Sequence, residues 1–541
     1  MPSPPISSRT LNLRTPLLLS ALIAFYAIQH IVWLRHFGAR APGEDLGQIE
    51  LMIPHYSALL DGRWGDFMAL LRENYSYSPL YYLGSIVSVF LFGKSIVSLL
   101  LPNLLYFSLA VVFIQFLGER FQNKTLGLWS AALFSLTPAV YLYSRSYCLE
   151  FGTMGLLPLT LWLLLKSEGF SRPLPCIGFG MAAAAASLMK DTHIALAFIA
   201  GPLLYVLYLA WKKIFVGNKR VLFNIFLAAA VFVGLLAPRY WNLDALRWRD
   251  PMEEIAGWVD VSVMTWGFIH RQLSWPLFLL FIVGGLALLK NRNREPLFVI
   301  LPWILVPWTI LTFMPHWKLT RHAIPYLPAV ALAMGYGLLS IGNRMVRDIL
   351  GTAILLVAAV QFYQFSSPIP PKNRLVSKNF VIDNKVVSMS EHRWKRNPIA
   401  VLEMVDRLKP AGGKLLIASR SHALWGLSTW LYAPRHWTIS FIKTGKPPWD
   451  MRPNERWLSN FKTCDFLVTS ESWDLAHHDL VAKWVQDLQS TNYPWETSLQ
   501  REETEFWRQY RDVRKTLRFQ EIAVFLDEEL PDFSVRLYAR Q

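Results

Sequence analysis

A closely spaced group of carboxylates follows the first long apolar run of this sequence. The run "PLLLSALIAFYAIQHIVWL" is long enough to cross a bilayer, and "GARAPGEDLGQIE" comes directly after it. This second stretch holds Glu44, Asp45 and Glu50. A carboxylate can remove the proton from an acceptor hydroxyl as a general base. The spacing therefore predicts an acid–base site immediately outside the lipid.

Further charged residues fall at the ends of other apolar runs, where charge is costly and often marks function. Lysine and arginine at such positions can hold a phosphate and stabilise the negative charge that develops on it as a leaving group. Carboxylates beside cations at a lipid surface therefore suit transfer from an anionic, lipid-linked donor. The residues that we single out beside the first acidic group are Arg145, Glu150, Lys190, Lys318, Arg321 and His322.

Each of these residues also has a purely structural interpretation. A lysine or arginine at a helix end could be an interfacial anchor whose charge reaches the lipid headgroups. Asp45 could be a helix cap or a loop carboxylate, and Glu150 could position the acceptor or a divalent ion. Carboxylates suit Mg²⁺ or Mn²⁺, but the sequence shows no recognisable complete set of metal ligands, so it assigns no cofactor with certainty.

The composition indicates a polytopic membrane protein. Of 541 residues, 53% are hydrophobic and only 17% are charged, and the apolar residues come in long blocks. The net charge of +16 comes mainly from short loops between these blocks, which fits membrane topology better than nucleic-acid binding. No small-residue cleavage site follows the first run, so we interpret it as a retained helix and not as a signal peptide.

About eleven apolar runs are candidates for spanning helices, which need roughly 17 to 25 residues. The stretch 175–211 must form two helices broken at "KDTH", because a single helix at about 1.5 Å per residue would far exceed a bilayer. The candidate runs lie near 16–34, 96–117, 126–143, 149–165, 175–188, 194–211, 221–237, 275–289, 297–313, 323–341 and 348–365.

The charge of the loops predicts which side each one faces. With the N-terminus in the cytoplasm, the basic loops "GERFQNK", "KSEGFSR", "WKKIFVGNKR", "KNRNRE" and "GNRMVRD" all fall on the cytoplasmic side. This requires that residues 79–92 do not cross, and about 14 apolar residues suit an interfacial or re-entrant helix better. The first outer loop is then 35–95, and all the charged residues singled out above face the outside.

The chain after residue 365 changes character. Short apolar stretches such as "KLLIAS", "CDFLVTS", "EIAVFLDEE" and "SVRLYAR" predict strands, and "NPIAVLEMVDRLKPAGG" predicts an amphipathic helix. We therefore expect a transmembrane module over 1–365 and an extracytoplasmic, soluble α/β domain over 366–541.

Several motifs in their order resemble a known superfamily. They are the acidic "GEDLGQIE", "YSPLYYLGSIVSVFLFG", "AALFSLTPAVYLYSRSYCLEFG", "GMAAAAASLMKDTHIAL" and "KLTRHAIPYLPAVALAMGYG". Together they resemble the C-type (GT-C) glycosyltransferases, most closely the dolichyl-phosphate-mannose protein mannosyltransferase branch, which includes bacterial lipid A aminoarabinose transferases. The resemblance covers roughly residues 10–365.

The resemblance implies a chemistry and two acidic positions. It implies inverting transfer from a polyprenyl-phosphate sugar donor on the extracytoplasmic face of a membrane. It also implies that Asp45 is the base, with Glu44 as its acidic neighbour. The second acidic position of the family, usually aspartate, falls on Glu150, so its carboxylate is displaced by about one methylene.

The resemblance also implies cations that hold the donor phosphate. The lysine at the end of the Gly/Ala-rich helix falls on Lys190, and a basic–aromatic pair falls on Arg321 and His322, where tyrosine is usual in place of the histidine. The segment "YSYSPL" departs from the family, because it lacks the cation or imidazole expected there.

The sequence favours a transferase over two other classes. A polytopic transporter or flippase of a lipid-linked or anionic substrate would need charge near the middle of the bilayer, whereas the charges here fall at helix ends on one side. A membrane-anchored scaffold would leave the outer carboxylates without a role. The expected partners are a polyprenyl-phosphate sugar, the bilayer and a protein, lipid or glycan acceptor, with no nucleic acid. The expected location is the inner membrane of a bacterium.

Overall fold

The protein is described by a computed structural model. It describes residues 14–37, 43–72, 79–190, 192–240, 272–313, 320–366, 401–418, 437–441, 464–469, 519–526 and 534–540. The contacts divide the chain into two compact units, which we describe separately. The helical unit consists of residues 1–40, 58–249 and 253–384, and the sheet-containing unit of residues 41–57, 250–252 and 385–541.

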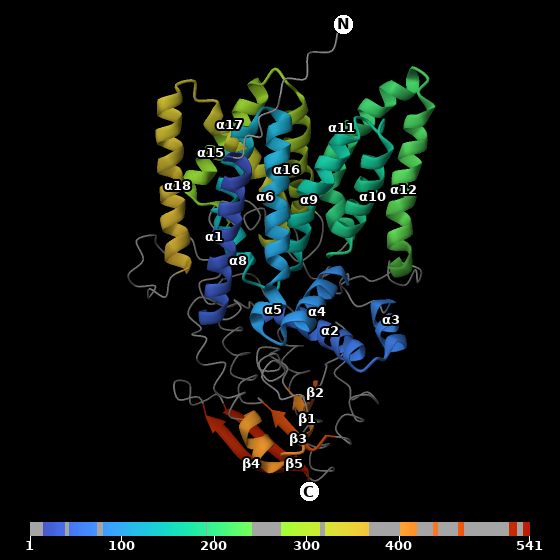
Figure 1. Ribbon diagram of the computed structural model, residues 1–541, viewed down its shortest axis with the longest axis vertical. Helices are drawn as coiled ribbons and strands as arrows, with labels where there is room; N and C mark the ends of the chain where they lie inside the picture. The colour runs from blue at the N-terminus through green and yellow to red at the C-terminus, as the bar shows by residue number, and fades with distance from the viewer. Residues whose placement is uncertain are drawn as a thin grey trace. The chain divides into compact units, whose positions relative to one another are not determined.

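The helical unit is a bundle of long apolar helices (Figure 1). Its first helices are α1 (Arg14–Phe37), α3 (Trp64–Arg72), α4 (Leu80–Phe92), α5 (Ile96–Leu100), α6 (Pro102–Phe121), α7 (Lys124–Ser135), α8 (Pro138–Tyr143) and α9 (Leu149–Lys166). The later elements are α10 (Pro173–Ser187), α11 (Thr192–Phe215), α12 (Lys219–Tyr240), α15 (Trp275–Lys290), α16 (Glu295–Phe313), the 3₁₀ helix η3 (Thr320–Tyr326), α17 (Leu327–Leu339) and α18 (Arg344–Ser366).

The predicted class of a helical, multi-pass membrane protein is confirmed. Among the described residues, eight stretches are long and apolar enough to cross a membrane, and they lie in α1, α5–α6, α9, α11, α12, α16, η3–α17 and α18. The prediction was about eleven. Two of the other predicted spans are α10 and α15, which have 15 and 16 residues and so extend about 22–24 Å against a bilayer core of about 30 Å. That these two helices cross stays a prediction.

The predicted span over 126–143 is wrong as a single helix. The chain forms α7 and α8 instead, separated at Leu136 and Thr137. Thr137 is extended, with φ −68° and ψ 127°, because the ring of Pro138 disfavours helical geometry in the residue before it. The break therefore follows from a proline that the apolar composition of the run conceals.

Two other predictions about the helices are confirmed. The stretch 175–211 forms α10 and α11 with an interruption between them. Residues 80–92 form α4, whose 13 residues extend about 20 Å, less than a bilayer core of about 30 Å, as the short apolar run predicted. Figure 1 shows α4 and α5 at the end of the bundle where α6 begins. The interfacial position of α4 stays a prediction.

Glycines allow the central helices to approach closely. A side chain at Gly155 in α9 would come within 2.5 Å of Tyr106 in α6, and one at Gly337 in α17 would meet the Leu280 carbonyl of α15 at 2.6 Å. Small residues at helix interfaces are how membrane helices bring their backbones together without a hydrophobic driving force. As a result α9 and α17 are surrounded by protein.

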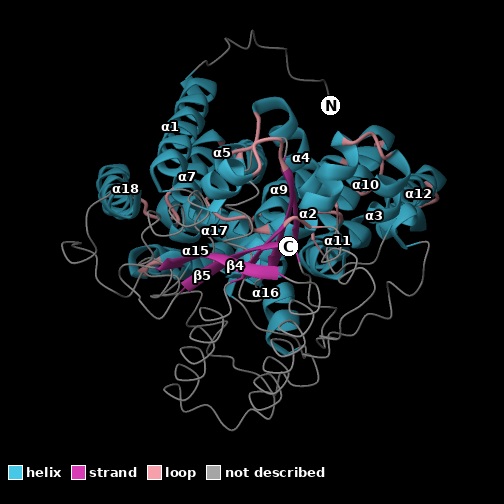
Figure 2. Ribbon diagram, turned by 90° about the horizontal axis from the view of Figure 1, so that it is seen from below, coloured by secondary structure: helices cyan, strands magenta, loops and turns pink. Residues whose placement is uncertain are grey.

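The sheet-containing unit holds a five-stranded mixed sheet, drawn in magenta in Figure 2, in the order β2-β1-β3-β5-β4. Strand β1 pairs in parallel with β2 and β3, whereas β5 pairs antiparallel with β3 and β4. The four predicted strand segments all form strands, and residues 401–408 are helical as predicted. The bounds are β1 (Gly413–Ala418), β2 (Trp437–Phe441), β3 (Phe466–Thr469), β4 (Phe519–Leu526) and β5 (Ser534–Arg540).

The helix α2 (Gly43–Leu60) belongs largely to the sheet-containing unit. It carries the acidic group that follows the first apolar run, so that segment is helical and not an extended loop. The backbone of Glu44 and Asp45 lies in its first turn. Their side chains lie outside the part of the chain that the structure describes.

Candidate functional site

Glu150 lies in the first turn of α9, at the end of a helix that is almost wholly enclosed by protein. Cys148, two residues before Glu150, has an extended backbone and caps the start of the helix. The Glu150 side chain is 3% exposed. A carboxylate in the first turn is favoured by the helix dipole, but burying its charge is costly unless cations and hydrogen-bond donors surround it.

Those cations come from two other elements of the helical unit. Lys190 follows the end of α10, and its ammonium group donates a short hydrogen bond to Glu150 Oε1. Arg321 and His322 lie in η3, with Arg321 Nε 3.3 Å and His322 Nε2 3.5 Å from the same oxygen. The structure therefore brings together four residues that the sequence analysis had singled out separately.

The second carboxylate oxygen is also occupied. The thiol of Cys148 donates a hydrogen bond of 3.3 Å to Glu150 Oε2. We call Cys148, Glu150, Lys190, Arg321 and His322 the Glu150 cluster. Within this cluster one carboxylate meets a lysine, an arginine and a histidine, so the basic side chains outnumber the acidic one. Ammonium and guanidinium groups are donors that bind phosphate and carboxylate groups.

The loop before α9 is fixed by residues that sequence reasoning missed. Asn103, at the start of α6, donates from Nδ2 to the carbonyls of Ser144 (2.8 Å) and Ser146 (3.0 Å). Its Oδ1 accepts a hydrogen bond of 2.7 Å from the Tyr81 hydroxyl in α4. The available signal was a polar asparagine at the head of an apolar helix, in "LPNLL". These bonds hold the chain that leads into Glu150.

Close packing beside the cluster depends on Gly152. A side chain there would come within 2.7 Å of the Met189 sulfur and 3.0 Å of the Tyr81 ring. The amide of Leu80 also donates to the Leu188 carbonyl at 3.0 Å, which joins the start of α4 to the end of α10. The residue before Lys190 is thus held against both α4 and α9, so the lysine is presented to Glu150 from a fixed backbone.

Tyr147 is the phenol nearest in sequence to the cluster. Its ring packs edge-on against Tyr81, with ring centroids 4.9 Å apart. Burial raises the pKa of the Tyr147 hydroxyl well above its ordinary value, despite a hydrogen bond with Ser85 that lowers it. This phenol therefore stays protonated at neutral pH and is unsuited to act as a base.

Arg145 has a different set of described neighbours. Its guanidinium carbon lies 4.8 Å from the ring centre of Trp33, 5.8 Å from that of Tyr141 and 5.6 Å from that of Phe362. These rings belong to α1, α8 and α18, and cation–π contacts of this length stabilise a buried arginine. The predicted role of Arg145 in phosphate binding stays a prediction, and its described contacts are those of a residue that joins helices.

Several predicted site residues lie outside the described part of the chain. They are Lys318 and the side chains of Glu44 and Asp45, together with the charged outer segment 241–271. Among the described residues, no group of three His, Cys, Asp or Glu side chains could hold a metal ion. Hydrogen-bond donors face both oxygens of Glu150, and three of its four neighbours in the cluster are basic. A divalent ion at the acidic residues stays a prediction.

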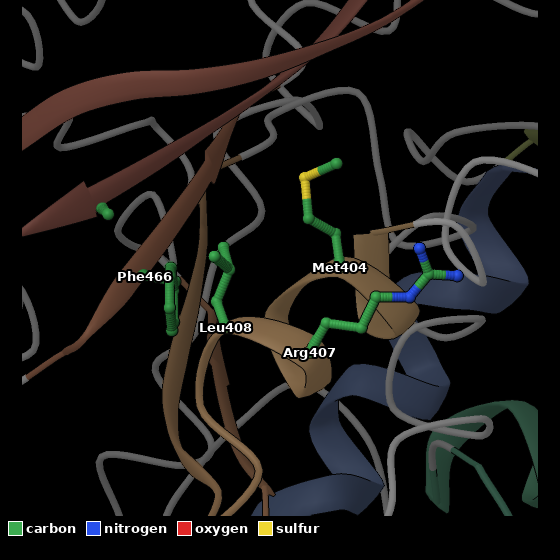
Figure 3. Close-up of a pocket in the computed structure, with 5 residues that line it drawn as sticks. Met404, Arg407, Leu408 and Phe466 are labelled. Carbon is green, nitrogen blue, oxygen red and sulfur yellow. The ribbon is translucent and has the colours of Figure 1, made fainter.

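The sheet-containing unit has one notable hollow among its described residues. A pocket of about 480 Å³ lies between the helix 401–408 and the sheet (Figure 3). Its lining is mostly apolar, and its members are Met404, Arg407, Leu408, Phe466 and Ala539. Nothing in this lining resembles the charged cluster of the helical unit.

The fold and the cluster define a multi-pass membrane protein with buried charge at the ends of its central helices. Residues 78–240 match the model of the family described as dolichyl-phosphate-mannose-protein mannosyltransferase. This match confirms the predicted resemblance to the GT-C glycosyltransferases. It covers the segment that holds Glu150 and Lys190.

Solved structures give further similarities at low identity. The bacterial ArnT of Cupriavidus metallidurans bound to undecaprenyl phosphate is 16% identical, with 76% of this chain and 75% of that chain covered and a TM-score of 0.49. The oligosaccharyltransferase of Archaeoglobus fulgidus is 11% identical, with 86% and 70% covered and a TM-score of 0.44. The mycobacterial arabinofuranosyltransferase AftD is 14% identical, with 99% and 40% covered and a TM-score of 0.48. No curated protein matches the chain.

Proposed function

We propose that this protein transfers a sugar from a polyprenyl-phosphate donor to an acceptor hydroxyl on the extracytoplasmic face of a membrane. The observation that carries the proposal is the meeting of Lys190, Arg321 and His322 around Glu150 at the ends of central helices. The family match supports it, because that family is described by transfer of mannose from dolichyl phosphate to protein.

The chemistry follows from the charges. The acceptor oxygen attacks the anomeric carbon while the bond from that carbon to the phosphate oxygen breaks, and polyprenyl phosphate leaves with the bonding electrons. Lys190 and Arg321 stabilise the negative charge that grows on this leaving group. A single displacement from the opposite face inverts the configuration at the anomeric carbon.

The proton of the acceptor hydroxyl must go to a base. We assign this role to Asp45, with Glu44 beside it, because the acidic group follows the first apolar run directly and lies in a helix. A positioned base typically contributes 10²- to 10⁴-fold to the rate. The lipid tail of the donor cannot leave the bilayer, so the acceptor must meet the donor at the lipid surface. A base at that surface can then take the proton of the acceptor.

The distribution of basic residues supports the proposed orientation. The last turns of α9, α11 and α15 carry Lys166, Lys213 and Lys290, respectively. In each helix the lysine lies at the end opposite to the one that we place outside. These are the helix ends that the positive-inside rule assigns to the cytoplasm. The Glu150 cluster would then face the extracytoplasmic side of a bacterial inner membrane, with the C-terminal domain on that side too. A transporter or flippase would need charge near the bilayer midplane, whereas Glu150 lies in the first turn of its helix.

The test is sugar transfer by the purified full-length protein in lipid nanodiscs. A panel of polyprenyl-phosphate sugars is offered with crude envelope acceptors to the wild type, to Asp45→Asn and to a control, Asp66→Asn. Asp66 is an exposed carboxylate of the same predicted outer loop and pairs with Arg63 at 2.5 Å. We expect transfer by the wild type and the control and at least a hundredfold loss in Asp45→Asn. Normal transfer by folded Asp45→Asn would contradict the assignment of the base.

A further inference from the structure

The feature that carries a further inference is the presence of hydrogen-bond donors at both oxygens of the buried Glu150 carboxylate. Lys190 donates to Oε1, with Arg321 and His322 beside it, and Cys148 donates to Oε2. A general base must offer a lone pair to the acceptor hydroxyl at about 2.6–3.2 Å. Glu150 faces donors on both oxygens and is 3% exposed, so this geometry opposes a proton-accepting role.

The same geometry gives Glu150 a different role. Lys190 and Arg321 are 6% and 13% exposed and come from separate elements, the end of α10 and η3. Two like charges brought together at low exposure repel each other strongly. A carboxylate from a third element, α9, placed between them offsets this repulsion and fixes the direction of both side chains.

We infer that Glu150 is a positioning residue, which holds Lys190 and Arg321 in the arrangement that receives the phosphate of the donor and takes no proton. This inference rests on the proposed function, because it specifies how that site binds its lipid phosphate. It separates the two acidic positions of the chain, with proton transfer left to the outer acidic group and phosphate binding organised by Glu150.

The inference makes the effects of Glu150 and Lys190 dependent on each other. If Glu150 acts through Lys190 and Arg321, removing Glu150 should cost less once the lysine is gone, because only its effect on Arg321 is then left to lose. If Glu150 were a base, its loss would multiply with the loss of the lysine, because the two would contribute separately to the transition state. A double-mutant cycle distinguishes these cases.

The experiment compares the wild type, Glu150→Gln, Lys190→Met and the double variant as full-length proteins in nanodiscs. The first measurement is binding of undecaprenyl phosphate, and the second is kcat and KM for a donor that the wild type consumes. We expect Glu150→Gln to weaken phosphate-lipid binding and raise KM about tenfold, and the double variant to match Lys190→Met within about threefold. Glu119→Gln, an exposed glutamate at the far end of α6, is the control and should leave both quantities unchanged.

The pH profile and a conservative variant separate positioning from a structural or a basic role. Glu150→Asp keeps the charge, so it should retain lipid binding better than Glu150→Gln. In the pH profile of kcat/KM, the rise that reports deprotonation of the general base should persist in Glu150→Gln. Loss of that rise in Glu150→Gln would overturn the inference. The inference would also fail if the double variant lost as much activity relative to Lys190→Met as Glu150→Gln loses relative to the wild type.

Failure of the inference and failure of the proposed function give different results. If the wild type consumes no donor yet the binding cycle is non-additive, the positioning role stands and the transferase proposal fails. If transfer occurs and the cycle is additive, the transferase stands and the positioning role fails. Thermal unfolding of each variant shows whether it folds. If Glu150→Gln does not fold, the double-mutant cycle is repeated with Glu150→Asp in its place.

Discussion

The helical unit contains two kinds of spanning helix that differ in their surroundings. In α9 and η3–α17, 78% and 94% of the residues in the apolar window are buried inside the protein, against 22% in α1, α12 and α18. Yet the mean hydropathy is lower in the buried pair, 1.3 against 2.4 for α12. The two most enclosed windows, in α9 and η3–α17, are therefore also the least apolar of those described, and the most apolar one, in α12, is among the least enclosed.

This difference explains where the charge is placed. A charged side chain that faces lipid has no partner, whereas one at the end of a helix enclosed by protein can be paired and hydrogen-bonded. The Glu150 cluster is built from elements that touch α9, and its members come from α9, the end of α10 and η3. The contrast between the buried and the outer helices therefore has measurable consequences.

The largest effect is expected from Lys190→Met. Lys190→Met removes the hydrogen-bond donor at Glu150 Oε1, but Arg321 stays 3.3 Å from the same oxygen. The loss of stability should therefore be smaller than the about 3–5 kcal/mol that is typical of a buried charge left without a partner. The donor phosphate also loses a cation, so transfer should fall at least a hundredfold. Lys290→Met, at the exposed end of α15, is the control for stability and activity. Equal effects of the two changes would remove the distinction between central and peripheral cations.

The next largest effect is expected on the stability of the protein, from substitutions at the adjacent glycines Gly284 and Gly285 of α15. A side chain at Gly284 would run into the Ala333 carbonyl of α17, whereas one at Gly285 would meet nothing within 4 Å. Gly284→Leu should therefore destabilise the protein by about 3 kcal/mol or more, because backbone has to move to make room. Gly285→Leu should leave the melting temperature nearly unchanged. Similar losses in both variants would show that α15 and α17 do not pack as described.

A charge on an outer helix should cost about 2.5–3.5 kcal/mol of insertion free energy. Phe226 lies within α12 and is 65% exposed, so we expect its side chain to face lipid. Phe226→Asp should then reduce the amount of membrane-inserted protein, whereas Phe226→Leu should not. Normal insertion of Phe226→Asp, measured by alkali-resistant membrane association, would contradict a lipid-facing α12.

The smallest effect is expected from an ion pair of the sheet-containing unit. Asp465 accepts hydrogen bonds from Lys409 Nζ and from the Lys414 amide, each at 2.8 Å. Burial alone would raise the pKa of Asp465, but these hydrogen bonds outweigh it and hold the pKa below the usual 3.8. A lowered pKa in the folded state stabilises the protein above about pH 4, and this contribution is lost as the pH falls.

Because this pair is partly exposed, its contribution should be below about 1 kcal/mol. The melting temperature of Asp465→Asn should therefore lie slightly below that of the wild type at pH 7, and the two should converge near pH 3. Glu403→Gln, at an exposed carboxylate whose ion pair with Arg407 is 3.9 Å long, is the control for the loss of one surface charge at pH 7. A gap that widens in acid would contradict the lowered pKa.

The sequence predicted four of the five members of the Glu150 cluster, whereas Cys148 was not among the candidates. Glu150, Lys190, Arg321 and His322 were chosen for charge at helix ends, and the fold brings them to one carboxylate. Four of the five strands were predicted too, because short apolar runs between polar turns leave few alternatives, whereas β2 (Trp437–Phe441) was not predicted.

Other features required contacts that no single stretch of sequence contains. Asn103 fixes the loop before α9 through carbonyls some forty positions away, and neither partner is visible from its own neighbours. The aromatic rings around Arg145 come from three helices. The break before Pro138 was visible locally but was hidden by counting apolar residues.

The most direct test of the account is release of polyprenyl phosphate from its sugar-linked form. Wild-type protein and Lys190→Met are placed in nanodiscs with the donor panel and an envelope acceptor, and free polyprenyl phosphate is measured over time. The account predicts acceptor-dependent release by the wild type and at least a hundredfold slower release by folded Lys190→Met. Equal release by both proteins, or none by the wild type with any donor, would contradict it.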